Sequence, residues 1–135
     1  QRNTLLTACL IPHSKNTFMR NFKELKIWQK GFQLALNCYK LTSTFPTQEK
    51  FGLVSQINRA GVSIPSNIAE GCSRSSNKDF SRFLEIAIGS IYEIETQLLI
   101  AFDLGYISQI KVDELIYDLD KITKMISKFR STLQN

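Results

Sequence analysis

Apolar side chains recur along most of the chain at the three- and four-residue steps of an amphipathic α-helix. A first helix is predicted over residues 22–42, and it ends before Pro46 because the residue preceding a proline avoids the helical conformation. A second helix is predicted over residues 47–71, with Thr47 as its N-terminal cap and Gly71 as its stop. Pro65 lies inside this second helix, so the pattern leaves open either a kink or a short break between two pieces.

Two further helices are predicted in the second half of the chain. Ser76 and Asp79 have the spacing of a capping box, which opens a third helix that runs to about Leu104 and is closed by Gly105. Ser108 opens a fourth helix, in which apolar residues repeat at close to seven positions. No strand pattern competes with these assignments. Because the connections between consecutive helices are short, the sequence predicts an all-α fold, an antiparallel up-down-up-down four-helix bundle.

The helical pattern begins only after Met19. Residues 1–18 show neither helical nor strand periodicity, so the simplest interpretation is an upstream segment outside the domain, with Met19 as the natural start. The bundle is then predicted to span residues 19–135. An alternative for the first segment is a lipoprotein signal ending at Cys9, although the basic region and long apolar stretch of such a signal are absent.

The first helix carries two apolar series on different sides. One series consists of Leu25, Trp28, Phe32, Ala35, Leu36 and Tyr39. The other repeats at close to seven residues and consists of Ile27, Leu34, Cys38 and Leu41. The third predicted helix is apolar over most of its circumference. Because one bundle core covers only one side of a helix, we expect the first and third helices to bury apolar surface against further copies of the chain.

Composition narrows the class of protein. The chain has 135 residues, of which 43% are apolar and 21% charged, as in globular proteins of one domain. No window approaches the roughly 18–20 apolar residues of a membrane-spanning helix, so no membrane partner is expected. The three cysteines are widely spaced and form no C-x-x-C pair. This spacing argues against a disulfide framework or a zinc site and favours a cytoplasmic location.

The distribution of charge is more informative than the net charge of +5. Antiparallel helices place the start of the first helix, the turn between the second and third, and the end of the fourth at one end of the bundle. That end holds eleven basic and four acidic residues, a balance of +7, whereas the opposite end holds three basic and eight acidic residues, a balance of −5. Arg59 falls near the middle. The candidate nucleic-acid contacts are Lys23, Lys26, Lys30, Arg59, Arg74, Lys78, Arg82, Lys121, Lys124 and Lys128.

Two of the lysine runs repeat at i, i+3 and i+7, so each run lies on one face of its helix. Such a surface suits a phosphate backbone, because each neutralised phosphate adds salt-dependent affinity. The alternative is that these lysines solvate an outer face and, in the fourth helix, complement its negative C-terminal end. No aromatic residues interleave the lysines as exposed stacking platforms would, so base-specific readout is not indicated.

Candidate catalytic chemistry is sparse. His13 is the only histidine and precedes the bundle, which excludes Ser-His-Asp and Cys-His catalysis and histidine metal ligands within it. The glycines match neither a P-loop nor a dinucleotide fingerprint. We therefore expect no enzyme, no cofactor and no metal. A polar run around Pro65 is assigned a structural role; it consists of Ser63, Ser66, Asn67 and Glu70.

Three stretches carry a resemblance to a known family: NFKELKIWQKG at 21–31, SQINRAGVSIPSNIAEG at 55–71 and DFSRFLEIAIGSIYEIETQLLIAFDLGYI at 79–107. Together they resemble the four-helix-bundle family of 23S rRNA intervening-sequence proteins, which is similar in turn to the accessory variability proteins of diversity-generating retroelements. The resemblance implies a bacterial origin, a homopentameric barrel of bundles, a nucleic-acid role and no established catalytic residues. Arg59, Arg74 and Arg82 match positions that are usually basic in the family, which makes them the leading contact candidates.

Two functional hypotheses follow. The first is a cytoplasmic, non-enzymatic oligomer that binds RNA or another nucleic acid through its basic end. The alternative is a protein-interaction scaffold, in which the extra apolar surfaces bind copies of the chain and the charges dock a protein partner.

Overall fold

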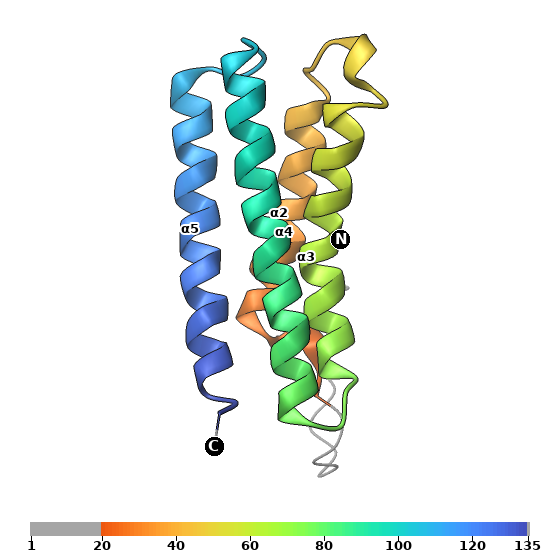
Figure 1. Ribbon diagram of the computed structural model, residues 1–135, viewed down its shortest axis with the longest axis vertical. Helices are drawn as coiled ribbons and strands as arrows, with labels where there is room; N and C mark the ends of the chain where they lie inside the picture. The colour runs from red at the N-terminus through yellow and green to blue at the C-terminus, as the bar shows by residue number, and fades with distance from the viewer. Residues whose placement is uncertain (1–19, 135) are drawn as a thin grey trace.

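The computed structural model describes residues 20–134, and its long helices run alternately up and down (Figure 1). The elements, in chain order, are η1 (Phe22–Glu24), α2 (Lys26–Thr42), η2 (Thr47–Glu49), α3 (Leu53–Cys72), α4 (Asn77–Asp103) and α5 (Gln109–Ser131), η1 and η2 being single 3-10 turns. No strand occurs within residues 20–134. The predicted all-α four-helix bundle is confirmed. The predictions for residues 1–18, for Met19 as the start and for Cys9 lie outside the described residues.

The predicted starts of the last two helices are confirmed. The Ser76 hydroxyl accepts a hydrogen bond from the backbone N–H of Asp79, and the Ser108 hydroxyl accepts one from Lys111 N–H. Each side chain satisfies one of the backbone donors that the first helical turn leaves without a partner. Gly105 follows α4 with φ of +82°, a conformation that costs glycine little because it has no Cβ. These signals therefore fix the α3–α4 turn and the α4–α5 turn.

The starts of the first two helices were predicted too early. Leu25 is extended, with ψ of 127°, and separates η1 from α2. Thr47 begins the short turn η2 rather than α3, which starts six residues later at Leu53. There the Glu49 carboxylate accepts a hydrogen bond from Leu53 N–H at 3.1 Å. A carboxylate that reaches forward in this way satisfies the exposed donor of α3 without a serine or threonine cap.

Helix α3 continues through Pro65 without a break, which rules out the two separate pieces that the sequence left open. Polar side chains surround the proline on one side. The Asn67 amide donates to the backbone C=O of Ser63 at 2.7 Å and to the Ser63 hydroxyl at 2.8 Å, and that hydroxyl lies 2.8 Å from the hydroxyl of Ser90 on α4. This part of the polar run therefore links α3 to α4.

Gly71 does not end α3, which extends to Cys72. Its role is to allow close packing against the start of α4. A Cβ built on Gly71 would lie 2.8 Å from Phe80 Cδ1 and 2.9 Å from Phe83 Cβ, far inside the normal carbon–carbon contact distance. Gly61 allows α3 to pack closely against α2 in the same manner. A Cβ built on Gly61 would lie 3.1 Å from the Cys38 sulfur.

The core lies between all four helices and is almost entirely aliphatic. Its largest fully buried side chains are Phe80, Ile57, Ile64, Ile68, Leu84, Ile91, Ile94, Leu98, Leu119, Ile126 and Val112. α3 has its closest contacts with α2 and α4, whereas α5 packs mainly against α4 and touches α2 over few residues. The bundle therefore has one loosely closed side, between α2 and α5.

The two apolar series of the first helix have separate destinations. Ile27, Leu34 and Cys38 of the heptad series are buried in the core. In the other series Phe32 (40% exposed) and Tyr39 (55% exposed) face outward, whereas Ala35 is buried; the Trp28 ring centre lies 5.1 Å from that of Phe32. The core thus leaves a second apolar face of α2 uncovered, as the double pattern predicts.

We predict opposite effects of alanine at two helical glycines. Gly71→Ala forces its Cβ into Phe80 and Phe83 and should lower the free energy of unfolding by about 1–3 kcal/mol. Gly89→Ala is the matched control, because a Cβ there meets nothing within 4 Å, and it should raise stability by about 0.5–1 kcal/mol through helix propensity. Urea unfolding followed by circular dichroism measures both, and a stabilised Gly71→Ala variant would contradict the close packing of α3 on α4.

Candidate nucleic-acid interface

The loosely closed side of the bundle, where α2 and α5 face each other, is called the seam here. Three concavities follow it from one end of the bundle to the other. We name them the acidic-end groove (volume about 390 Å³), the middle groove (about 140 Å³) and the apolar hollow (about 330 Å³). Both rims of the seam come from helices far apart in sequence, so only the folded bundle brings their lysines together.

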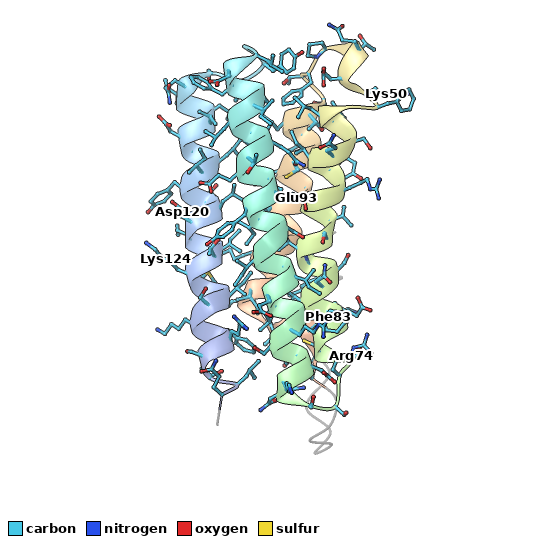
Figure 2. The ribbon with its side chains drawn as sticks, in the orientation of Figure 1. Lys50, Arg74, Phe83, Glu93, Asp120 and Lys124 are labelled. Carbon is cyan, nitrogen blue, oxygen red and sulfur yellow. The ribbon has the colours of Figure 1, made fainter. Side chains whose placement is uncertain are left out.

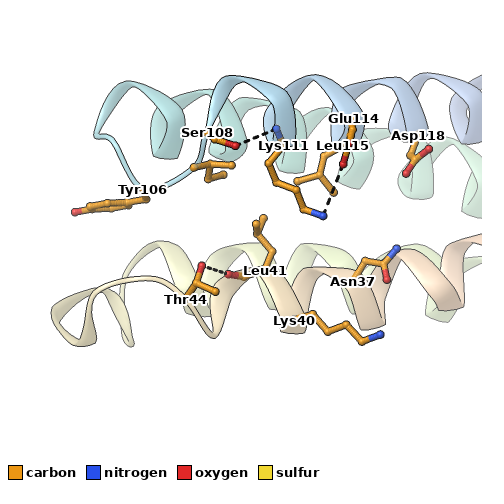
Figure 3. A pocket seen from close by; sticks show the side chains of 11 residues that line it. Asn37, Lys40, Leu41, Thr44, Tyr106, Ser108, Lys111, Glu114, Leu115 and Asp118 are labelled. Atoms are coloured by element: carbon orange, nitrogen blue, oxygen red, sulfur yellow. Dashed lines mark hydrogen bonds and ion pairs between the residues drawn. The ribbon is translucent and has the colours of Figure 1, made fainter.

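The acidic-end groove contains charges of both signs (Figure 3). Lys40 of α2 and Lys111 of α5 line it together with Glu114 and Asp118. The Lys111 ammonium lies 3.9 Å from the Glu114 carboxylate, an exposed pair between neighbouring turns of one helix. Mixed charge of this kind gives no net attraction for a polyanion.

Lysines of the two helices face each other across the middle groove. Lys30 of α2 and Lys121 of α5 line it, together with the single acidic residue Asp118. The Lys121 ammonium also lies 5.5 Å from the centre of the Tyr117 ring, whose side chain is 65% exposed one helical turn earlier. An exposed aromatic ring therefore adjoins the lysine run of α5. The ring does not interleave the run, because Tyr117 precedes its first lysine, Lys121.

The apolar hollow lies at the basic end, between the start of α2 and the end of α5. Lys26 and Lys128 stand on its two sides, and both side chains are exposed. Between them the lining is apolar except for one threonine; it consists of Leu25, Ile27, Met125, Phe129 and Thr132. No acidic side chain lines the hollow.

A further concavity lies between the start of α4 and the end of α5. Its charged lining consists of the basic residues Lys78, Arg82 and Arg130 and the acidic residues Asp79 and Glu85. Arg130 is already engaged, because its Nε donates to the Ser81 hydroxyl at 2.7 Å and its guanidinium lies 2.9 Å from the Glu85 carboxylate. Lys78 and Arg82 are exposed, and neither forms an ion pair with another residue of the described range 20–134. Two of the predicted contacts are thus brought together here.

The remaining predicted contacts are dispersed. Arg74, at the α3–α4 turn, stacks over the Phe83 ring at 4.7 Å and pairs with Glu70 at 3.2 Å (Figure 2). Lys23 lies in η1 with its ammonium 5.7 Å from the Phe22 ring, and Lys124 is exposed on the outer face of α5. Arg59 lies in the half of α3 nearer the acidic end, and the structure does not bring it to the other basic residues.

Arg20 is one of the basic residues at the basic end, but its guanidinium is engaged in contacts within the fold. Its guanidinium lies 4.7 Å over the Phe80 ring and donates hydrogen bonds to the backbone C=O of Arg74 and to the Asn77 side-chain oxygen. It therefore ties the segment before η1 to the α3–α4 turn. No sequence spacing reveals this contact, since Arg20 and Asn77 are 57 positions apart.

Charge is divided between the halves of the bundle rather than between its two tips. Figure 2 shows Glu93 and Asp120 near the middle of α4 and α5. Lys121 is likewise ten residues, or about 15 Å, from the last residue of α5. The basic surface therefore extends from the end of the bundle to its middle along the seam.

No side-chain cluster in the described part of the chain has the features of a reactive centre. Cys38 and Cys72 are buried free thiols, and burial raises the pKa of each to about 11, so both remain protonated at neutral pH. Within residues 20–134 no group of three or more His, Cys, Asp or Glu side chains is placed to hold a metal ion. Over the same residues, none of the helices combines the length and the apolar character needed to cross a membrane.

Comparison with known proteins gives independent evidence of the family to which the chain belongs. The structure is similar to the crystal structure of a protein of unknown function from the S23 ribosomal protein family of Bacteroides thetaiotaomicron, with a TM-score of 0.72 and 26% sequence identity. The match covers 78% of this chain and 95% of the other. No curated protein matches the chain. The family model described as 23S rRNA-intervening sequence protein matches residues 23–128, so the chain belongs to the family of 23S rRNA-intervening sequence proteins.

Proposed function

We propose that the protein is a cytoplasmic, non-enzymatic oligomer that binds RNA or another nucleic acid along the basic half of the seam. The observation that carries the proposal is the pairing of lysines across the seam. Lys26 faces Lys128 over the apolar hollow, and Lys30 faces Lys121 over the middle groove. Cations on both rims of one groove neutralise a phosphate backbone from both sides, and each contact releases counterions. The family description, which names 23S rRNA, agrees with an RNA partner.

The contacts are proposed in two groups. The seam supplies Lys26, Lys30, Lys121 and Lys128, with Lys124 beside them on α5. The concavity at the start of α4 supplies Lys78 and Arg82. Arg74 and Lys23 lie at the same end and contribute to the field, whereas Arg59, on the other half of α3, is proposed only as a peripheral contact.

Self-association is proposed through the outer face of α2 and α3. The sequence pattern favoured α2 and the third predicted helix, which is α4, but no residue of α4 lines the groove on this face. A groove of about 330 Å³ lies there, and none of its lining residues is charged: Trp28, Phe32, Ala35, Leu36, Tyr39, Val62, Pro65, Ser66 and Ala69. An exposed apolar surface of this kind is costly in water and is typical of a subunit contact. A second copy of the chain is the proposed occupant, and the family resemblance favours a homopentamer. On α2, Phe32 and Lys30 project about 160° apart, since residues advance 100° each around a helix, so association leaves the seam open.

The competing function is a protein-interaction scaffold. It is favoured by the mixed charge of the acidic-end groove and by the pairing of Arg74 with Glu70 and of Arg130 with Glu85, since paired charges suit a protein partner better than a polyanion.

Charge reversal distinguishes the two functions. We predict that Lys121→Glu/Lys124→Glu/Lys128→Glu weakens RNA binding at least tenfold at about 50 mM salt and lowers the slope of log K against log salt by about 2–3. Lys40→Glu/Lys50→Glu/Lys111→Glu is the matched control, because it makes the same change in net charge in the acidic half and should have a much smaller effect. Filter binding at several salt concentrations measures both.

Two outcomes would reject nucleic-acid binding through the seam. One is an equal loss of affinity in both triple variants, which would show that only net charge matters. The other is the absence of RNA affinity in the unaltered protein at low salt. The scaffold function would then be supported if the purified protein forms a stable oligomer and its ultraviolet absorbance ratio shows that it carries no nucleic acid.

A single charge should dissociate the oligomer. We predict that Phe32→Glu, in the uncharged groove of α2 and α3, converts the protein to a 15.4 kDa monomer, measured by light scattering. Phe51→Glu is the control, because Phe51 is 89% exposed at the turn before α3 and lies outside that groove. An unaltered protein that is already monomeric would refute the association, as would a Phe32→Glu variant that keeps its oligomeric mass.

A further inference from the structure

The apolar hollow is an uncharged surface inside the most positive part of the seam. Its floor is formed by the half-buried side chains of Leu25, Met125 and Phe129, and Lys26 and Lys128 stand at its sides. Its volume of about 330 Å³ is at the lower end of the roughly 300–1,000 Å³ typical of small-ligand sites. A phosphate backbone gains nothing from contact with apolar side chains. Lysine–phosphate contacts alone therefore do not account for an apolar hollow between two lysines.

We infer that the seam binds single-stranded nucleic acid, with one unpaired base in the apolar hollow and the flanking phosphates on Lys26 and Lys128. The inference rests on the proposed function and names the form of nucleic acid that the site takes. An unpaired base has apolar faces that gain from burial against Met125 and Phe129, and its own backbone supplies the two adjacent charges. Sites for single strands commonly combine a cationic groove with apolar or aromatic surfaces that contact the bases.

A duplex does not satisfy both parts of the site. Its base faces are stacked inside the double helix, and extruding a base costs a few kcal/mol for unstacking and unpairing. A duplex therefore presents only its phosphates to Lys26 and Lys128, and the apolar lining remains exposed to water. The hollow thus adds affinity for single strands only.

The course of the strand follows from the shared lining of neighbouring concavities. Met125 lines both the apolar hollow and the middle groove, so the two are continuous along the seam. A strand leaving the hollow next meets Lys30 and Lys121. Beyond them it reaches Asp118 and the paired Lys111 and Glu114, where the attraction for phosphate ends. The bound segment therefore spans the basic half of the seam.

The hollow has little means of distinguishing one base from another. Thr132 is its one polar uncharged residue, and the Thr132 hydroxyl already donates to the backbone C=O of Phe129 at 2.6 Å. Base identity is read by hydrogen bonds to base edges, which an apolar lining does not provide. Binding at the hollow is therefore expected for any unpaired base.

The test fills the hollow without changing charge. Thr132→Leu places a larger apolar side chain at its edge, and Ser131→Leu is the matched control on the adjacent position, which does not line the hollow. Both substitutions remove a hydroxyl that donates to a backbone carbonyl at 2.6 Å, so their effects on the end of α5 are alike. Met125→Gln is a second variant, which keeps side-chain length and makes the lining polar.

Dissociation constants are measured by fluorescence anisotropy at low salt for three probes of equal length: oligouridylate RNA, oligothymidylate DNA and an RNA duplex. We expect Thr132→Leu and Met125→Gln each to weaken binding of both single strands at least about fivefold, the lower limit for loss of one stacked base. Duplex binding should stay within twofold in every variant, and Ser131→Leu should behave like the unaltered protein. A twofold or greater preference for RNA over DNA in the unaltered protein assigns the strand as RNA, and equal affinity assigns either.

The failure of this inference is distinguishable from that of the proposed function. Single strands and duplex bound through the seam lysines, with no loss of single-strand affinity in Thr132→Leu and Met125→Gln, would overturn the inference and leave the function standing. An equal loss of affinity for all three probes in these variants would also overturn it. No binding of any probe by the unaltered protein would overturn both.

Discussion

The close approach of α3 to its two neighbours is the contact on which the rest of the molecule depends. At Gly61 and Gly71 the missing side chain lets α3 lie directly against Cys38 of α2 and against Phe80 and Phe83 at the start of α4. Three helices thereby form a tight unit around the fully buried Ile57, Ile64 and Ile68. Packing at such density leaves little room for rearrangement, so the outer faces of these helices are held in fixed relative positions.

Helix α5 completes the core from one side only. It contributes Val112, Leu119, Ile122 and Ile126, which pack mainly toward α4, and its contact with α2 is sparse. Tight packing of the first three helices and loose closure by the fourth explain why three concavities follow one another along the seam between α2 and α5. The same division separates the surfaces of α2: its heptad series enters the core, its aromatic series faces outward, and its lysines stand at the seam.

Much of the fold follows from local chemistry that the sequence displays directly. The caps at Ser76 and Ser108 and the turn at Gly105 involve residues only a few positions apart, and they were predictable. The start of α3 was not, because Glu49 takes the place of the expected cap at Thr47 through a contact that no standard motif describes. Pro65 was ambiguous since proline permits both a break and a continued helix, and the choice is made by packing.

The positive charge of the candidate interface was predictable from the sequence, but the positions of its lysines relative to one another were only partly so. Alternating helix direction was enough to collect the lysines at one end. Helix direction does not give the rotation of each helix about its axis. That rotation places Lys26 and Lys128 on the same hollow, and Lys30 and Lys121 on the same groove. Helix direction also hides the neutralisation of Arg130 by Glu85 and the use of Arg20 within the fold, because both depend on contacts between distant segments.

The division of charge gives the molecule a large electric dipole along the helix axes. α4 has 27 residues and is about 40 Å long, so the centres of the positive and negative halves lie roughly 20 Å apart. Such a molecule rotates in the field of an approaching polyanion and turns its positive half forward before contact. Salt shortens the reach of that field to about 10 Å at 0.1 M, so ionic strength controls the orientation of encounter as well as its rate.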